Sequence, residues 1–80
     1  SSKWLSGIDA EVVEVLVKEG APITKKPIMY LDLPKGVNIG GVIRNNEAYI
    51  AKGNVQIMPG DKVVAFTIPE SANKLMKLFN

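Results

Sequence analysis

Short runs of apolar and β-branched side chains, separated by glycine, proline and asparagine, occupy most of this chain. Runs of about four to eight such residues predict strands, and the residues between them predict turns. The last stretch differs, because its apolar side chains recur at intervals of three and four, as on the buried face of a helix. Strands are predicted at residues 10–18, 38–44, 47–50, 55–57 and 62–66, with a short helical turn at 26–31 and a helix at the end.

The first predicted strand is apolar on both of its faces. Val13, Val15 and Val17 alternate onto one face, while Val12 and Leu16 lie on the other. Such a strand suits a sheet that is covered on both sides or that meets another subunit. A domain of 80 residues buries only about 60% of the surface of its unfolded chain, so we expect it to form a homodimer.

Three short sequences predict special backbone geometry. Asn45-Asn46 tolerates the positive φ angles of a tight hairpin turn. Pro59-Gly60 has the residue order of the central positions of a type II turn, and Asp61 is expected to organise that turn rather than bind a ligand. Gly40-Gly41 inside a strand predicts a bulge or a close backbone approach, with a ligand or partner contact as the alternative.

The terminal helix is predicted from the spacing of its apolar positions. These positions are Ala72, Leu75, Met76 and Phe79. Thr67 and Glu70 stand three residues apart at its start and predict a capping box.

The order of the predicted elements gives an α+β fold. We expect a small two-layer domain with a mixed sheet of about four to five strands, a short helix after the first strand and a C-terminal helix. Residues 9–80 are assigned to this domain, and residues 1–8 to a linker or an expression remnant.

The composition argues against an enzyme. Cysteine and histidine are absent, which removes the commonest nucleophile, the commonest general base and the commonest ligands of transition metals. The carboxylates do not have the spacing of a calcium loop, and the glycines match neither a dinucleotide fingerprint nor a P-loop. We therefore expect no catalytic residue, no metal site and no cofactor in this domain.

Charge and hydropathy limit the partners. The net charge is only +2, and the lysines are spread along the chain instead of forming a stripe. Since nucleic-acid binding needs a concentrated basic surface, we do not expect nucleic acid as a partner. No run approaches the roughly 20 apolar residues of a membrane-spanning helix, so direct membrane insertion is not expected either.

The end of the second predicted strand is the one candidate binding site. Arg44 stands beside the hairpin turn, where its guanidinium fork can grip a phosphate or a carboxylate. The alternative is a solvent-exposed strand end that only keeps this edge soluble. An anionic ligand is expected to contact the apolar side chain of Ile43, the fork of Arg44 and the amides of Asn45 and Asn46.

Three linked segments carry a family resemblance. The first is 21–34, whose ending Leu31-Asp32-Leu33-Pro34 is its most specific part; the second is 39–47, and the third is 52–66. Together they resemble the TrkA C-terminal domain family, also called the RCK C-terminal (regulator of potassium conductance) family. The resemblance runs from about residue 10 to residue 79. The chain departs from the usual residues of the family at Lys25, Pro27, Gly40 and Gly41.

The resemblance implies a cytoplasmic regulatory domain, peripheral to the inner face of the cell membrane. Such domains pair as homodimers and act with a membrane potassium transporter subunit through their parent protein. Some members bind cyclic di-AMP or another small effector at the dimer interface, whereas NAD or ATP belongs to a neighbouring nucleotide-binding domain that these 80 residues do not include.

We therefore expect a ligand-sensing and dimerising domain of a potassium uptake (Trk-type) system. The alternative is a structural dimerisation module of another cation antiporter or anion transporter, with no small-molecule ligand.

Overall fold

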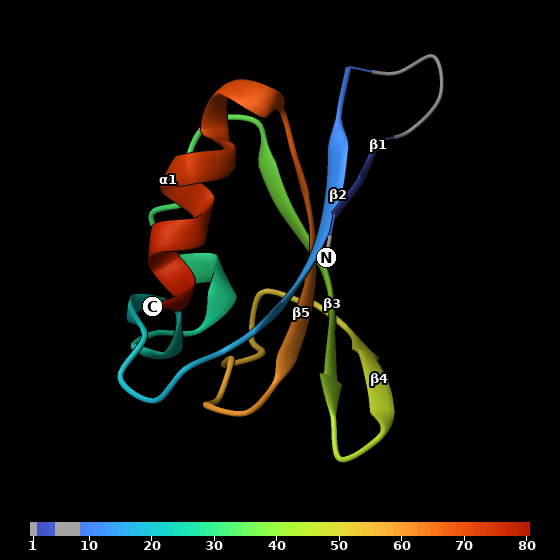
Figure 1. Ribbon diagram of the computed structural model, residues 1–80. Coiled ribbons are helices and arrows are strands. Elements are labelled where there is room, and N and C mark those ends of the chain that lie inside the picture. Colours follow the sequence, from blue (N-terminus) through green and yellow to red (C-terminus); the bar gives the residue numbers. More distant parts are fainter. Residues whose placement is uncertain (1, 5–8) are drawn as a thin grey trace.

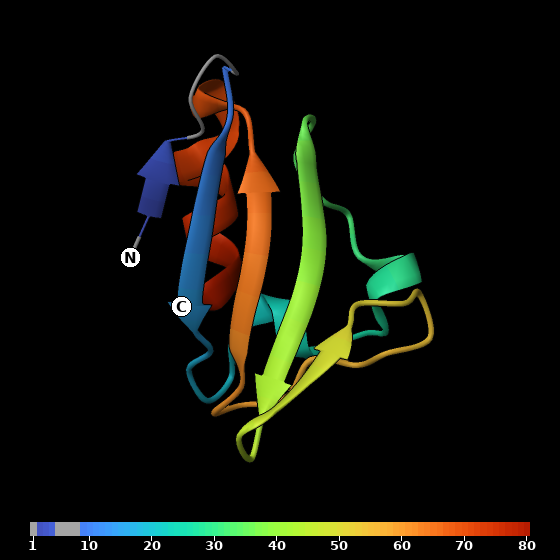
Figure 2. The same ribbon diagram turned by 90° about the vertical axis from the view of Figure 1, so that its right-hand side faces the viewer.

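The computed structural model describes residues 2–4 and 9–80. Its described strands form one five-stranded sheet in the order β1-β2-β5-β3-β4 (Figure 1). The strands are β1 Ser2–Trp4, β2 Glu11–Leu16, β3 Val37–Arg44, β4 Glu47–Ile50 and β5 Lys62–Thr67. The last strand in the sequence, β5, therefore lies in the middle of the sheet, between β2 and β3 (Figure 2).

A helical segment at the end of the chain covers one face of the sheet (Figures 1 and 2). Its parts are the 3₁₀ turn Pro69–Ser71, α1 Ala72–Met76 and the 3₁₀ turn Lys77–Phe79. The predicted C-terminal helix is thus confirmed, and Leu75 and Phe79 are buried in it as expected. Met76 remains 37% exposed and does not share their environment. No helix of the described chain is long and apolar enough to cross a membrane.

The core lies between the sheet and this helical segment. Because side chains alternate along a strand, β2 and β5 send every second residue into the core, and β3 does so on either side of a register shift between Ile39 and Gly41. The register places Val13 beside Ala65 and Ala65 beside Ile39, which joins the three strands on this face. The buried apolar side chains are Val13, Val17, Ala21, Ile23, Ile39, Val42, Ile57, Val63, Ala65, Leu75 and Phe79.

The sheet differs from the mixed sheet that was predicted. Every described strand pair is antiparallel. The segment 55–57, predicted as a strand, forms none. The Ile28 N–H donates to the Val55 carbonyl oxygen at 2.9 Å and the Val55 N–H to the Lys52 carbonyl oxygen at 3.0 Å, so these groups pair with loops rather than with the sheet.

The short helix expected after the first strand is not confirmed. Residues 26–31 contain one 3₁₀ turn, Ile28–Tyr30, and another, Pro22–Thr24, precedes it. Pro27 separates the two turns, and a proline disfavours the helical conformation at the residue before it. The segment therefore consists of two single turns and no α-helix.

The predicted capping box at the start of the terminal helix is wrong. Thr67 is the last residue of β5, and its Oγ1 donates to the Ile68 carbonyl oxygen at 2.9 Å. No side chain caps the 3₁₀ turn that follows. Pro69 begins that turn, at a position where a helix needs no N–H donor.

The two predicted turns are confirmed. Asn45 and Asn46 have φ angles of 51° and 63°, which join β3 to β4 by a two-residue hairpin turn. Gly60 has a φ angle of 89°, and the Asp61 N–H donates to the Met58 carbonyl oxygen at 3.1 Å, as in a type II turn.

The linker predicted for residues 1–8 lies largely outside the described residues. Within that range, residues 2–4 pair with the start of β2 as strand β1. The role of this segment in a longer chain stays a prediction.

Candidate functional site

The sheet has a covered face, against α1, and an open face. Figure 2 looks onto the open face, with α1 behind the strands. On strands β2 to β5, the residues that alternate with the core residues form this face. They are Val12, Glu14 and Leu16 on β2, Asn38, Gly41 and Ile43 on β3, Ala48 and Ile50 on β4, and Lys62, Val64 and Phe66 on β5.

The four predicted site residues do not share one surface. Ile43 lies on the open face, while Arg44, the next residue, turns toward the other side of the sheet. Asn45 and Asn46 form the exposed hairpin turn between β3 and β4. Whether these residues bind a ligand stays a prediction.

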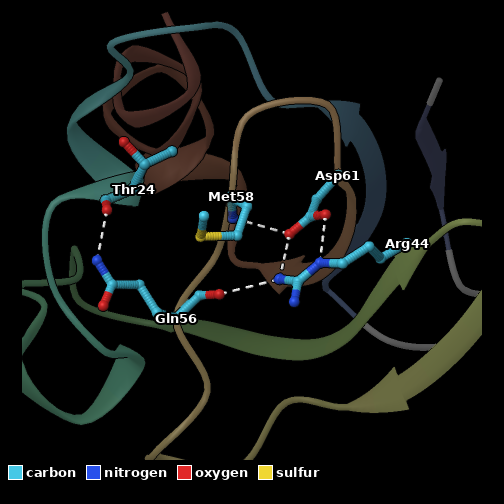
Figure 3. A network of polar contacts seen from close by, with 5 residues as sticks. All are labelled: Thr24, Arg44, Gln56, Met58 and Asp61. Atoms are coloured by element: carbon cyan, nitrogen blue, oxygen red, sulfur yellow. Dashed lines mark hydrogen bonds and ion pairs between the residues drawn. The ribbon is translucent and has the colours of Figure 1, made fainter.

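The guanidinium of Arg44 forms an ion pair with the carboxylate of Asp61 in the same chain (Figure 3). Its Nε donates to Asp61 Oδ1 at 2.8 Å and its Nη2 to Asp61 Oδ2 at 2.7 Å, a bidentate and charge-assisted pair. Nη2 also donates to the Gln56 carbonyl oxygen at 3.0 Å. The Arg44 side chain is only 36% exposed and makes these three hydrogen bonds. It is therefore not the solvent-exposed side chain that the alternative interpretation of the sequence placed at this strand end.

Asp61 organises its turn, as predicted. Its side chain is 2% exposed, and its Oδ2 accepts a hydrogen bond from the Met58 N–H at 2.8 Å. Burial by itself would raise the pKa of this carboxyl. The hydrogen bonds from Arg44 and Met58, with the charge of Arg44, outweigh burial and hold the pKa of Asp61 below its ordinary value.

A second contact extends the network to the first 3₁₀ turn. Gln56 Nε2 donates to the Thr24 carbonyl oxygen at 2.9 Å (Figure 3). The network of Thr24, Arg44, Gln56 and Asp61 thereby ties the end of β3 and the start of β5 to two loops. Sequence reasoning missed it, because its bonds join residues that are 12, 17 and 32 positions apart.

The open face contains a hollow above the two glycines of β3. The pairing of β3 with β5 shifts between Ile39 and Gly41, so the predicted bulge is confirmed. A Cβ on Gly40 would lie 2.9 Å from Cε2 of Phe66, so the ring of Phe66 packs against bare backbone. The hollow measures 310 Å³ and is lined by Gly40, Gly41, Ala48, Tyr49, Ile50, Val64 and Phe66.

Comparison with known families decides the classification. Residues 12–80 match the family model of the TrkA-C domain. The chain belongs to the TrkA-C domain family. The match begins in β2 and takes in every later strand and the whole helical segment, so the resemblance read from the sequence is confirmed.

Individual relatives of this TrkA-C domain are Trk proteins. Trk system potassium uptake protein TrkA homolog 1 of Methanosarcina mazei is 33% identical over 75 residues, which is 94% of this chain and 17% of the relative. The TrkA proteins of Azorhizobium caulinodans and Halomonas elongata are 30% identical over 69 residues and 34% identical over 62 residues. The chain covers only 15% and 14% of these two proteins, so it spans about a sixth of the length of its relatives.

Proposed function

We propose that this TrkA-C domain is a regulatory domain of a potassium uptake (Trk-type) system. It acts on the cytoplasmic side, peripheral to the inner face of the cell membrane, and meets the membrane transporter subunit through its parent protein. Two copies pair through their open faces. The observation that carries the proposal is an exposed apolar sheet face on a domain whose relatives are named Trk potassium uptake proteins.

The exposure of the open face supports pairing. Leu16 is 59% exposed, Ile50 74% and Phe66 40%, and all three lie on the same face of the sheet. Single exposed apolar side chains are ordinary, but a contiguous apolar face marks an interaction surface.

The charges of the open face favour a second copy as its partner. On strands β2 to β5 the face carries one acid, Glu14, and one base, Lys62, so the formal charges of these four strands balance. A two-fold interface joins a surface to itself, which a balanced and apolar face permits and a strongly charged one opposes.

Regulation then follows from the pairing. A small effector shifts an assembly between two states only by its difference in affinity for them. An anionic effector such as cyclic di-AMP would bind at Ile43, Arg44, Asn45 and Asn46. Both asparagines are exposed, and Arg44 Nη1 makes no hydrogen bond to residues 2–4 or 9–80, so this nitrogen supports the proposed contact.

A structural dimerisation module without a ligand is the competing function. The internal pairing of Arg44 favours it, because two of the three guanidinium nitrogens already have partners. Such a module would serve equally in another cation antiporter or in an anion transporter.

Two measurements on the 80-residue chain test these functions. Sedimentation equilibrium should show a dimer at micromolar concentrations, and a monomer throughout the high micromolar range would contradict pairing. Calorimetric titration with cyclic di-AMP and related nucleotides should give saturable heat. If the chain dimerises but gives no heat with any of these nucleotides, the structural dimerisation module is the function that remains.

A further inference from the structure

We propose that the hollow above Gly40 and Gly41 is a socket that receives the Leu16 side chain of a second copy of this chain. The inference rests on the proposed pairing and names the contact that makes it specific. A flat apolar sheet face can slide on another, whereas a side chain seated in a hollow fixes one position.

The hollow has the form of a socket for an aliphatic side chain. Its floor is the backbone of Gly40 and Gly41, and its walls are mostly apolar side chains, including Ile50, Val64 and Phe66. A water-sized group occupies roughly 30 Å³ of liquid volume, so 310 Å³ accommodates the four side-chain carbons of a leucine. If the hollow stayed empty in a dimer interface, the residues that line it would lose van der Waals contacts on that side. A side chain of the partner that fills the hollow restores those contacts.

The open face supplies the matching side chain. Leu16 is 59% exposed and lies on β2, at one side of the central strand β5. The hollow extends from β5 over β3 to β4, on the side of β5 that faces away from β2. A two-fold axis that runs near β5 between two stacked sheets exchanges these sides, so Leu16 of each copy faces the hollow of the other.

The charges of strands β2 to β5 favour a second copy of this chain over a charged ligand. A charged peptide or a nucleotide would need unpaired charge in or around the hollow. The seven residues that line it carry no charged side chain, and the formal charges of Glu14 and Lys62, on the described strands β2 to β5, offset each other. A second copy of the same face is the partner that this chemistry fits.

Gly41→Val fills the socket with little disturbance of the fold. Gly41 does not have a positive φ, and a Cβ there would lie 3.4 Å from the Tyr49 carbonyl oxygen, at the limit of an ordinary contact. Gly40 is unsuitable, because a Cβ there would meet the Phe66 ring. Leu16→Ala removes the side chain that enters the socket, and Met29→Ala is its control, since Met29 is 56% exposed and lies outside the open face.

The dimer dissociation constant of each chain is measured by sedimentation equilibrium, with circular dichroism to verify folding. We expect Gly41→Val and Leu16→Ala each to raise this constant about tenfold or more, as loss of a buried interface anchor does, and Met29→Ala to leave it unchanged. In the double variant the dissociation constant should rise by less than the product of the two single-variant factors, because both changes remove the same contact.

The outcomes separate this inference from the proposed function. If Gly41→Val and Leu16→Ala have the same dimer dissociation constant as the parent chain, the socket is overturned and pairing is left intact. A parent chain that stays monomeric overturns pairing and the socket together. If Gly41→Val fails to fold, Leu16→Ala against Met29→Ala decides: equal dissociation constants overturn the socket, and a tenfold difference supports it.

Discussion

The covered and open faces of the sheet are built from the same strands and from almost equally apolar residues. On the covered face Val63 and Ala65 are completely buried, whereas on the open face their neighbour Phe66 remains 40% exposed. Leu16, between the core residue Val17 and the half-buried Val15, is 59% exposed. The apolar character of the strand residues therefore does not decide which face of this sheet is buried. The helical segment decides it, since it covers one face only.

The largest expected effect of a single substitution is on the covered face. Leu75→Ala or Phe79→Ala removes a side chain that is 0% or 1% exposed and leaves a cavity between α1 and the sheet. We expect each to lower the free energy of unfolding by about 2–5 kcal/mol, as large-to-small changes in cores do. Urea denaturation monitored by circular dichroism measures the loss.

A matched control lies on the same helix. Met76 is 37% exposed, so Met76→Ala should cost much less than Leu75→Ala. Equal losses at the two positions would mean that α1 does not set the difference between the faces.

The next effect concerns the polar network at the edge of the covered side. Arg44→Ala leaves the Asp61 carboxylate, 2% exposed, with the Met58 N–H and without its ion pair. We expect a loss of about 1–3 kcal/mol. This is less than for a fully buried pair, because Arg44 is partly open to water. Arg44→Lys keeps the charge but not the guanidinium fork, so its free energy of unfolding should lie between those of the parent chain and Arg44→Ala. An unchanged free energy of unfolding in both variants would refute a stabilising role of the ion pair.

A smaller effect is expected from pH. The pKa of Asp61 in the folded chain lies below its value in the unfolded chain, which is about 3.9 for an ordinary aspartate. A carboxyl of this kind stabilises the fold above its unfolded pKa, and the contribution disappears as the pH falls through the folded pKa. The free energy of unfolding should therefore decline as the pH is lowered from about 5.

Asp61→Asn isolates this contribution, since an amide does not titrate. Denaturation curves at several pH values should show a steeper decline in the parent chain than in Asp61→Asn. Parallel declines would assign the acid sensitivity to other carboxylates.

The smallest effect is expected on the open face. Ile50 is 74% exposed, so Ile50→Ser should change the free energy of unfolding of the monomer by less than about 0.5 kcal/mol. Thermal melts at a concentration below the dimer dissociation constant measure this. A loss comparable with that of Leu75→Ala would show that something already covers the open face.

Much of the local structure follows from the sequence, because local signals determine it. The alternation of valines in β2, the Asn45-Asn46 turn and the Pro59-Gly60 turn depend on preferences of neighbouring residues, and the structure has all three. The Gly40-Gly41 bulge is of the same kind. The family resemblance is confirmed over residues 12–80, and two of its three motifs, 39–47 and 52–66, include these turns and the bulge.

What the sequence did not reveal depends on distant contacts. The antiparallel pairing of β3 with β5 and the partners of Arg44 join segments that no local pattern connects. An arginine beside a hairpin turn looks available to a ligand until the Asp61 carboxylate is placed next to it. The hollow is also non-local, since residues of three strands surround its glycine floor.

The central position of β5 has a consequence for the synthesis of the protein. β2 and β3 each form their longest pairing with β5, and neither pairs with the other. A nascent chain that has emerged only as far as residue 61 therefore carries two strands with a gap between them. The sheet cannot close until residues 62–67 leave the ribosome, and we expect this domain to fold only after nearly all of it has been translated.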